Sequence, residues 1–209
     1  EKTLPARFFN NTLISSGGPQ QFTNIFKIGV NPRDSVDTTS DGTVVNIGGI
    51  FFADSAAAYN NVVPLSGGVN YNDGEWHRLV VSRPSGSGNQ DLTFYVDGSS
   101  IGTAPCNPLW DNMSVFDFGQ EWDGSGESDF FQGKMSNIQV YDYAWTSDDV
   151  TYDYANPNKL AIDNPSTSLV VTNLKAYWAL SEGDGLVAYD SGTNLEEEEV
   201  VNGDFATDS

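Results

Sequence analysis

The sequence contains few of the residues on which small domains often depend. Only one of its 209 residues is cysteine and only one is histidine. A single cysteine, Cys106, excludes a disulfide within the chain, so the fold must be held by its core or by partner subunits. We interpret Cys106 as a small buried thiol. The single histidine, His77, excludes a multi-histidine zinc site, and the pattern around it predicts a place in a strand.

Basic residues are also scarce. The formal net charge is −20, and residues 105–209 carry 20 of the 29 acidic residues but only 3 of the 9 basic ones. Nucleic acids and anionic membranes are bound through clustered Lys and Arg, so the sequence argues against both partners. No apolar run approaches the roughly 18 residues of a membrane span, and no signal peptide is visible. We therefore expect no membrane insertion, and we interpret the chain as an internal or processed piece.

The composition that remains favours an all-β fold. The chain has 21 glycines, 12% aromatic residues and only 18% charged residues, which is typical of short strands joined by tight turns. Apolar and β-branched periodicity predicts strands, and Asp-Gly pairs at 41–42 and 97–98 suit hairpin turns. A phase slip between Met135 and Ile138 suggests a bulge. The predicted strands are residues 22–30, 43–52, 76–83, 92–96 and 133–141.

One helix is predicted, after the last of these strands. Thr146 offers an N-cap, Asp148 and Asp149 place negative charge in the first turn, and Asn156-Pro157 ends the helix. Residues 158–170, with proline among Asn, Ser and Thr, are interpreted as a linker.

Two segments resemble a known family. Residues 73–83 (DGEWHRLVVSR), followed by residues 92–98 (LTFYVDG), resemble the central hairpin of laminin-G-like and pentraxin-like domains. Residues 131–150 are similar to the last strand and short helix of the same family. The resemblance implies a concanavalin A-like jelly roll of two antiparallel sheets over residues 1–157, with Trp76 and Trp145 in its core.

The C-terminal part resembles the beginnings of further modules. Residues 174–192 resemble the opening strands of another laminin-G-like domain, so residues 171–195 either start a second unit or form a strand-donating tail. Such a tail would serve this chain or a neighbouring subunit, and would bury Tyr177, Trp178 and Leu180. Residues 196–209 are interpreted as an acidic linker followed by the first strand of a galactose-binding-like carbohydrate module. Such strings of modules imply a phage virion or a bacterial surface protein.

Residues 117–129 are rich in carboxylates and glycine, and they carry the predicted metal site. Ca²⁺ takes roughly 6–8 oxygen ligands, and Asp123, Glu127 and Asp129 with nearby carbonyls supply part of such a shell. The alternative is a solvated acidic turn.

Two tryptophans in predicted loops are the candidate sugar-binding residues. The indoles of Trp110 and Trp122 can stack on a sugar ring while Asp123 binds hydroxyl groups. The alternative is that both indoles cap the core.

Glycoside hydrolysis is not predicted. Retaining glycosidases of this fold carry a Glu-x-Asp-x-(x)-Glu strand, and residues 127–132 (ESDFFQ) lack the second glutamate. The chain is therefore expected not to be an enzyme.

The composition, the family resemblance and the candidate sites together favour a structural or adhesion module. We expect a virion or cell-surface protein, extracellular in location, that forms homo-oligomers and contacts glycans, a host surface, neighbouring copies or other virion proteins. The alternatives are a lectin with calcium on its rim or, less favoured, a glycoside hydrolase of the same fold.

Overall fold

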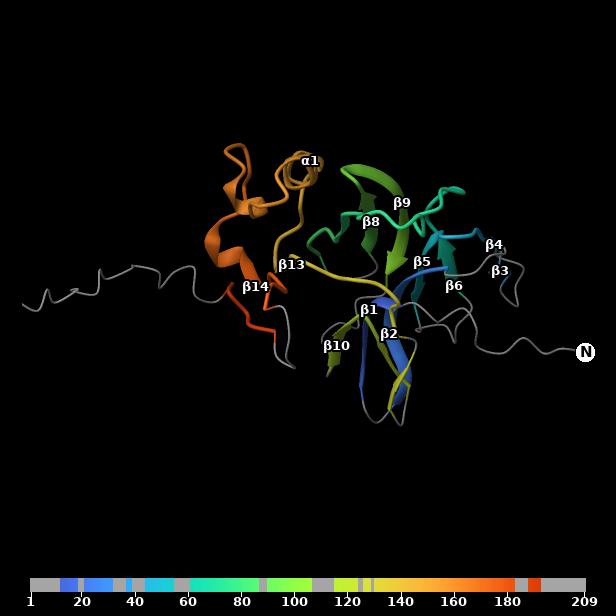
Figure 1. The fold of residues 1–209 in the computed structure, drawn as a ribbon. Coiled ribbons are helices and arrows are strands. Elements are labelled where there is room, and N and C mark those ends of the chain that lie inside the picture. Colours follow the sequence, from blue (N-terminus) through green and yellow to red (C-terminus); the bar gives the residue numbers. More distant parts are fainter. Residues whose placement is uncertain are drawn as a thin grey trace, which may run out of the picture. The chain divides into compact units, whose positions relative to one another are not determined.

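The computed structural model describes residues 12–18, 21–31, 37–38, 44–54, 61–86, 90–106, 115–123, 126–128, 130–182 and 188–192. The chain divides into two compact units, Glu1–Gly133 and Lys134–Ser209. Both are shown in Figure 1.

The first unit is built from antiparallel sheets. One sheet has five strands in the order β10-β1-β2-β5-β6, and a second has three in the order β7-β8-β9. Two short two-stranded ladders, β3-β4 and β11-β12, accompany them. The five-stranded sheet comprises β1 (Thr12–Gly18), β2 (Gln21–Val30), β5 (Ile50–Asp54), β6 (Asn61–Pro64) and β10 (Val115–Phe118). The others are β3 (Asp37–Thr38), β4 (Val44–Val45), β7 (Leu79–Ser82), β8 (Gln90–Val96), β9 (Ser99–Cys106), β11 (Glu121–Asp123) and β12 (Gly126–Ser128).

The main core joins these two sheets. Side chains alternate along a strand, so Ile50 and Phe52 of β5 share one face of the five-stranded sheet. They belong to one buried cluster with Leu92, Phe94 and Val96 of β8. The rings of Phe52 and Phe94 lie 5.6 Å apart between centroids. The two sheets therefore form a sandwich, which confirms the predicted fold class.

The opposite face of β5 is covered as well. Phe51 and Ala53 alternate with the core residues and form a second buried cluster with Val45 and Val62. Burial on both faces explains the continuous apolar run of this strand.

The structure has two strands, β4 and β5, where the sequence predicted one over residues 43–52. A turn at Gly48, with φ of +62°, separates β4 from β5. The side-chain amide of Asn31 donates to the carbonyls of Val45 and Asn46 at 3.0 and 3.1 Å. These bonds stabilise the bend that β-propensity alone does not reveal.

Two other predicted strands begin later than expected. The strand predicted over residues 76–83 starts at Leu79, and the one predicted over residues 133–141 is β13 (Ile138–Tyr141). Asn137 adopts a left-handed φ of +53°, so the chain turns into β13 there. The phase slip before Ile138 is this turn and not a bulge.

Several strands were not predicted. Serine and glycine dilute the β-signal of β1, and Gly102 and Pro105 dilute that of β9. Both pair over most of their length, β1 with β2 and β10, and β9 with β8. Residues 117–129, expected to form a loop, include the end of β10 and the β11-β12 ladder.

The second unit begins with β13 and the predicted helix. Helix α1 (Ser147–Ala155) has Thr146 as its N-cap, in a reciprocal capping box with Asp149, and Asn156 as its C-cap. Residues 158–170, interpreted as a linker, carry the 3₁₀ helix η3 (Ala161–Asp163), and Ala161 and Leu169 are buried. None of the described helices has the length and apolar character required to span a membrane.

The tail pairs within the chain. After the 3₁₀ helix η4 (Val171–Asn173), strand β14 (Leu174–Trp178) runs antiparallel to β13. Leu174 and Ala176 are its buried residues. Tyr177, Trp178 and Leu180 are half-buried within this chain, and their burial against a neighbouring subunit stays a prediction. Leu174, Ala176 and Trp178 alternate along β14, so the two buried residues share one face of the strand with Trp178.

Candidate functional site: the Trp76 loop

Residues 70–78, here called the Trp76 loop, lead into strand β7 over an ordered backbone. The amide of Tyr71 donates to the carbonyl of Gly48 at 3.0 Å. The Asn70 side chain accepts a hydrogen bond from the Asn72 amide at 2.8 Å, which forms a local turn. A Cβ on Gly48 would overlap the Asn70 side chain, so glycine is required beneath the loop.

Trp76 is 65% exposed on this loop, which corrects the expectation that it lies in the core. Strand β7 begins only at Leu79, so the strand alternation that would turn the indole inward does not reach Trp76. The residues around it on the loop are polar and exposed, namely Asn70, Asn72, Asp73 and Glu75. Trp145, the other tryptophan expected in the core, is half-buried and contacts Tyr141 edge to face.

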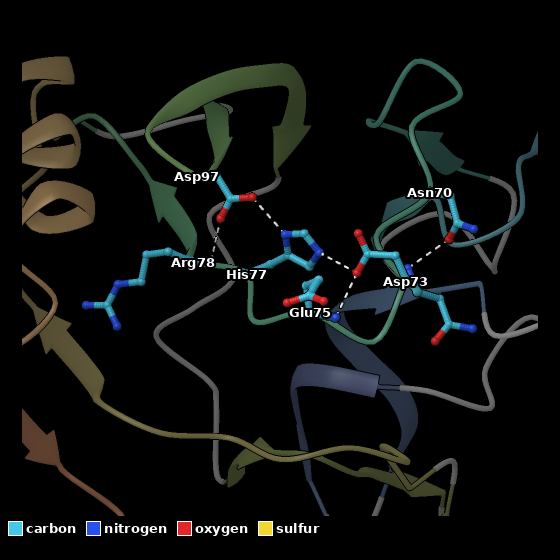
Figure 2. A network of polar contacts seen from close by, with 7 residues as sticks. Asn70, Asp73, Glu75, His77, Arg78 and Asp97 are labelled. Carbon is cyan, nitrogen blue, oxygen red and sulfur yellow. Dashed lines mark hydrogen bonds and ion pairs between the residues drawn. The ribbon is translucent and has the colours of Figure 1, made fainter.

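His77 lies between two carboxylates, as Figure 2 shows. Its Nδ1 is 2.7 Å from Oδ2 of Asp97, and its Nε2 is 3.0 Å from Oδ1 of Asp73. Tyr71 meets the imidazole edge to face, with ring centroids 5.2 Å apart. His77 precedes β7 instead of lying in a strand, so the sequence-based placement was wrong by two residues.

Asp97 is held by the turn between β8 and β9. It has φ of +51°, followed by Gly98 at +79°, as the Asp-Gly pair predicted. Its Oδ1 accepts from the amide of Arg78 at 2.9 Å, and its own amide donates to the Arg78 carbonyl at 3.0 Å. Because Leu79 pairs with Val96, the next position along the ladder places Asp97 beside Arg78.

The two carboxylates change the acidity of the site. Partial burial lowers the pKa of His77, but hydrogen bonds and charges from Asp97 and Asp73 outweigh it, and the pKa lies above its ordinary 6.5. The Glu75 amide, which donates to Asp73 at 2.9 Å, and then His77 hold the pKa of Asp73 below its usual range. The site therefore favours an ion pair on each side of the ring.

The contacts of His77 with Asp73 and Asp97 are suited to fixing the position of the loop and not to transferring a proton to or from a substrate. Both ring nitrogens of His77 are engaged by carboxylates, so the ring presents no lone pair to a substrate. The imidazole also occupies the space between Asp73 and Asp97, where a glycosidic bond would have to lie for these two to act as a catalytic pair. The exposed indole beside polar side chains is the part that can bind a ligand.

Little of the predicted sugar and calcium sites falls within the part of the chain that the structure describes. Trp110 and Asp129 are not among the described residues. Trp122, Asp123 and Glu127 are described in their backbone, where Trp122 pairs with Glu127 and Asp123 with Gly126, but not in their side chains. Trp122 belongs to a strand and not to a loop. Within the described side chains, no group of three or more His, Cys, Asp or Glu could hold a metal ion.

Sequence reasoning missed the His77 network, although a signal was present. Asp73 stands four residues before His77, and the predicted hairpin ending at Asp97-Gly98 brings Asp97 back to the start of β7. Counting the register from the turn would have paired these residues. The exposure of Trp76 carried no such signal.

Comparison with protein families adds an independent finding. Residues 15–151, well over half of the chain, match a laminin-G-type family described as the concanavalin A-like lectin/glucanases superfamily. A search of curated proteins found no match. The superfamily supports a carbohydrate-binding or structural module in general, and its description includes glucanases as well as lectins. Together with the antiparallel sandwich of the described residues, this match shows that the chain belongs to the concanavalin A-like lectin/glucanases superfamily.

Proposed function

We propose that the chain is a non-catalytic carbohydrate-binding module whose sugar platform is Trp76. The observation that carries this proposal is the indole, 65% exposed on an ordered loop of amides and carboxylates. An exposed aromatic face stacks on the apolar face of a sugar ring, and neighbouring polar side chains bind its hydroxyls. Asn70, Asn72 and Asp73 are exposed on the same loop and provide such groups.

The charge of the site narrows the class of glycan. Asp73 and Glu75 flank the indole in sequence, and the whole chain has a formal net charge of −20. Carboxylates and sulfates on a sugar would be repelled by this surface. We therefore favour neutral glycans over uronic-acid, sialylated or sulfated ones.

The first test is a glycan-array measurement with the full chain and a Trp76→Ala variant. Losing an aromatic stacking surface costs about 1.5–3 kcal/mol, so affinity should fall by roughly tenfold to a hundredfold. Tyr154→Ala is the matched control, because Tyr154 is 49% exposed on α1 and belongs to no polar loop network of this kind. Equal binding by the wild type and Trp76→Ala would remove Trp76 as the platform.

Calcium binding by the acidic segment is a second proposal, and one buried atom supports it. Oδ1 of Asp117 accepts from Gln120 at 3.1 Å, whereas its buried Oδ2 has no hydrogen-bond partner in the described part of the chain. A buried carboxylate oxygen without a partner fits a hard cation, and Asp123, Glu127 and Asp129 are the further candidate ligands. Calorimetric titration with Ca²⁺ tests this, with Asp117→Asn as the variant expected to weaken binding.

We place this module in a virion or cell-surface protein, in contact with host glycans and with copies of itself. The strongly acidic composition and the resemblance of residues 201–209 to the start of another carbohydrate module support this context. Light scattering of the full chain measures whether it is an oligomer. Incubation with neutral β-glucans and analysis of the released sugars tests the glucanase alternative.

A further inference from the structure

We propose that His77 is a pH-operated latch that fastens the Trp76 loop to the β8–β9 turn, and that loss of its proton releases the Asp73 side of the loop. The proposal concerns regulation of the site described above. It depends on the proposed sugar binding only for its effect on ligand affinity, and the latch itself can be measured without any ligand.

The geometry fits a doubly protonated ring. Both nitrogens lie within 3.0 Å of carboxylate oxygens, which accept hydrogen bonds and cannot donate them when ionised. A neutral imidazole carries one N–H, so it could satisfy only one of these two contacts. The structure therefore assigns an imidazolium that donates to Asp97 on one side and to Asp73 on the other.

Deprotonation affects the two contacts differently. The bond to Asp97 is the shorter, at 2.7 Å, and Asp97 is additionally fixed by the Arg78 amide. A neutral His77 that keeps its proton on Nδ1 retains this bond. Its Nε2 lone pair then faces the Asp73 carboxylate at 3.0 Å, and that contact changes from attractive to repulsive. The segment between Asp73 and His77, which includes Trp76, then loses its contact at the Asp73 end and keeps the His77–Asp97 contact at the other end.

The groups facing His77 set the direction of the switch. Tyr71 packs against the ring edge, Asp73 comes from the same loop, and Asp97 comes from the β8–β9 turn. Of the charged neighbours in sequence, Glu75 adds negative charge to the loop, and the guanidinium of Arg78 points away from the ring in Figure 2. The charges that reach the imidazole are therefore negative, and they stabilise its protonated form.

The rest of the loop has supports that do not depend on His77. Tyr71 is bonded to the Gly48 carbonyl and packs against the main core, and Asn70 closes its own turn with Asn72. We expect residues 70–72 to keep their positions when the latch opens. Residues 73–76 should gain mobility, so the change is confined to the part that presents the indole.

The latch can be observed directly because His77 is the only histidine of the chain. Its imidazole signals in a proton–carbon NMR spectrum need no assignment by mutation. The midpoint of their titration should lie above 6.5, since the folded-state pKa is raised. The protection factors of the amides of residues 74–76, which are exchange rates corrected for the intrinsic base-catalysed rise with pH, should fall as the pH rises through that midpoint. A midpoint at or below 6.5, or exchange that does not follow it, would overturn the latch.

Variants separate the two carboxylates. Asp97→Asn and Asp73→Asn each remove one charge and one acceptor, so each should lower the titration midpoint. Asp91→Asn is the matched control. It lies at the other end of β8, six residues or roughly 20 Å from Asp97 along the strand, well beyond a Debye length of about 8 Å in physiological salt. A midpoint that moves as much in Asp91→Asn as in Asp97→Asn would show a general charge effect and not a latch.

The effect on ligand binding is the final step. Affinity for a glycan that the wild type binds should fall above the midpoint by up to roughly tenfold per pH unit, and His77→Gln should remove this dependence. If no glycan binds at any pH, the proposed function fails while the titration and exchange results still decide the latch. If a glycan binds equally well on both sides of the midpoint, the function stands and its regulation by His77 is wrong.

Discussion

Gly48 determines the path of the backbone beneath the Trp76 loop. Its φ of +62° is costly for residues with a Cβ, and such a Cβ would overlap the Asn70 side chain. Gly48→Ala should therefore lower the free energy of unfolding by about 1 kcal/mol through the backbone conformation and by about 1–3 kcal/mol more through the overlap. Urea denaturation measures this loss.

Gly67→Ala separates the two contributions to this loss. Gly67 has φ of +54°, and a Cβ there would meet nothing within 4 Å. It should lose only the conformational part, about 1 kcal/mol. Equal losses in the two variants would mean that Asn70 moves aside at no cost, and that the loop is less rigid than its hydrogen bonds indicate.

Single residues also show where sequence reasoning ended. Trp76 belongs to a family-like motif that predicted a core residue, yet exposure depends on where the strand begins, and β-propensity does not locate that point within three residues. The partners of His77 were accessible in principle, because Asp97 follows from hairpin register. Whether Asp123, Glu127 and Asp129 converge is a question of side-chain placement that spacing alone does not answer.

Helix α1 depends on Asp149 more than on any other acid in its first turn. The Asp149 carboxylate accepts from the Thr146 amide and hydroxyl at 2.9 and 2.7 Å and from the side-chain amide of Asn164 at 3.2 Å, while its own amide donates to Thr146. It thereby links the helix start to the segment that follows η3, and the side chain is buried. The predicted N-cap is confirmed, and the buried link to Asn164 is what periodicity could not show.

Replacing Asp149 should destabilise the second unit strongly. Asp149→Ala removes several charge-assisted hydrogen bonds and should cost about 2–3 kcal/mol of unfolding free energy. Asp148→Ala is the control, because Asp148 is exposed in the same turn and contributes mainly through the helix dipole, at about 0.3–1 kcal/mol. Helix content followed by circular dichroism in urea measures both, and similar losses would contradict a structural role for the buried carboxylate.

The stability that Asp149 gives to helix α1 should depend on pH. Burial raises the pKa of Asp149, but hydrogen bonds from Thr167, Thr146 and Asn164 outweigh it, so the net pKa lies below its ordinary 3.8. A lowered folded-state pKa contributes stability that is present above about 3.8 and is lost as the pH falls through the folded value. The difference in stability between wild type and Asp149→Asn should therefore shrink below pH 3.8, as measured by urea unfolding at several pH values.

For the whole molecule, the sequence predicted the sandwich but not all of the strands that complete its sheets. Strong apolar segments such as β2, β5 and β8 carry a clear signal, and they form the main core. The strands that complete the sheets, β1 and β9, contain Ser, Gly or Pro and are specified by pairing with neighbours. The family match ends at residue 151, whereas β13 inside it is completed by β14 at Leu174–Trp178, outside it.

That pairing bears on whether the tail serves its own chain or a neighbour. The connection between β13 and β14 is itself folded, with Gln139 of β13 donating to Asp153 of α1 at 3.3 Å and accepting from the amide of Ala161 at 3.4 Å. Beyond β14, Asp190 accepts from the Tyr177 amide at 2.9 Å, and Gly192 lies so close to the Tyr177 backbone that a Cβ would reach 2.7 Å from its nitrogen. The Gln139 contacts fix residues 153–161 to β13, which shortens the free segment that could carry β14 to a neighbouring subunit, so pairing within one chain is expected.

A pair of engineered cysteines tests this expectation directly. Val140 and Ala176 are partners across the β13–β14 ladder, and facing positions in an antiparallel pair lie within disulfide reach. In a Cys106→Ser background, Val140→Cys with Ala176→Cys should oxidise to a monomer at all protein concentrations. Separately made single-cysteine chains, mixed and refolded together, should give few dimers joined at this ladder. Abundant Val140–Ala176 dimers would instead show that β14 is donated between subunits, which is the arrangement that would build an oligomer from strand exchange.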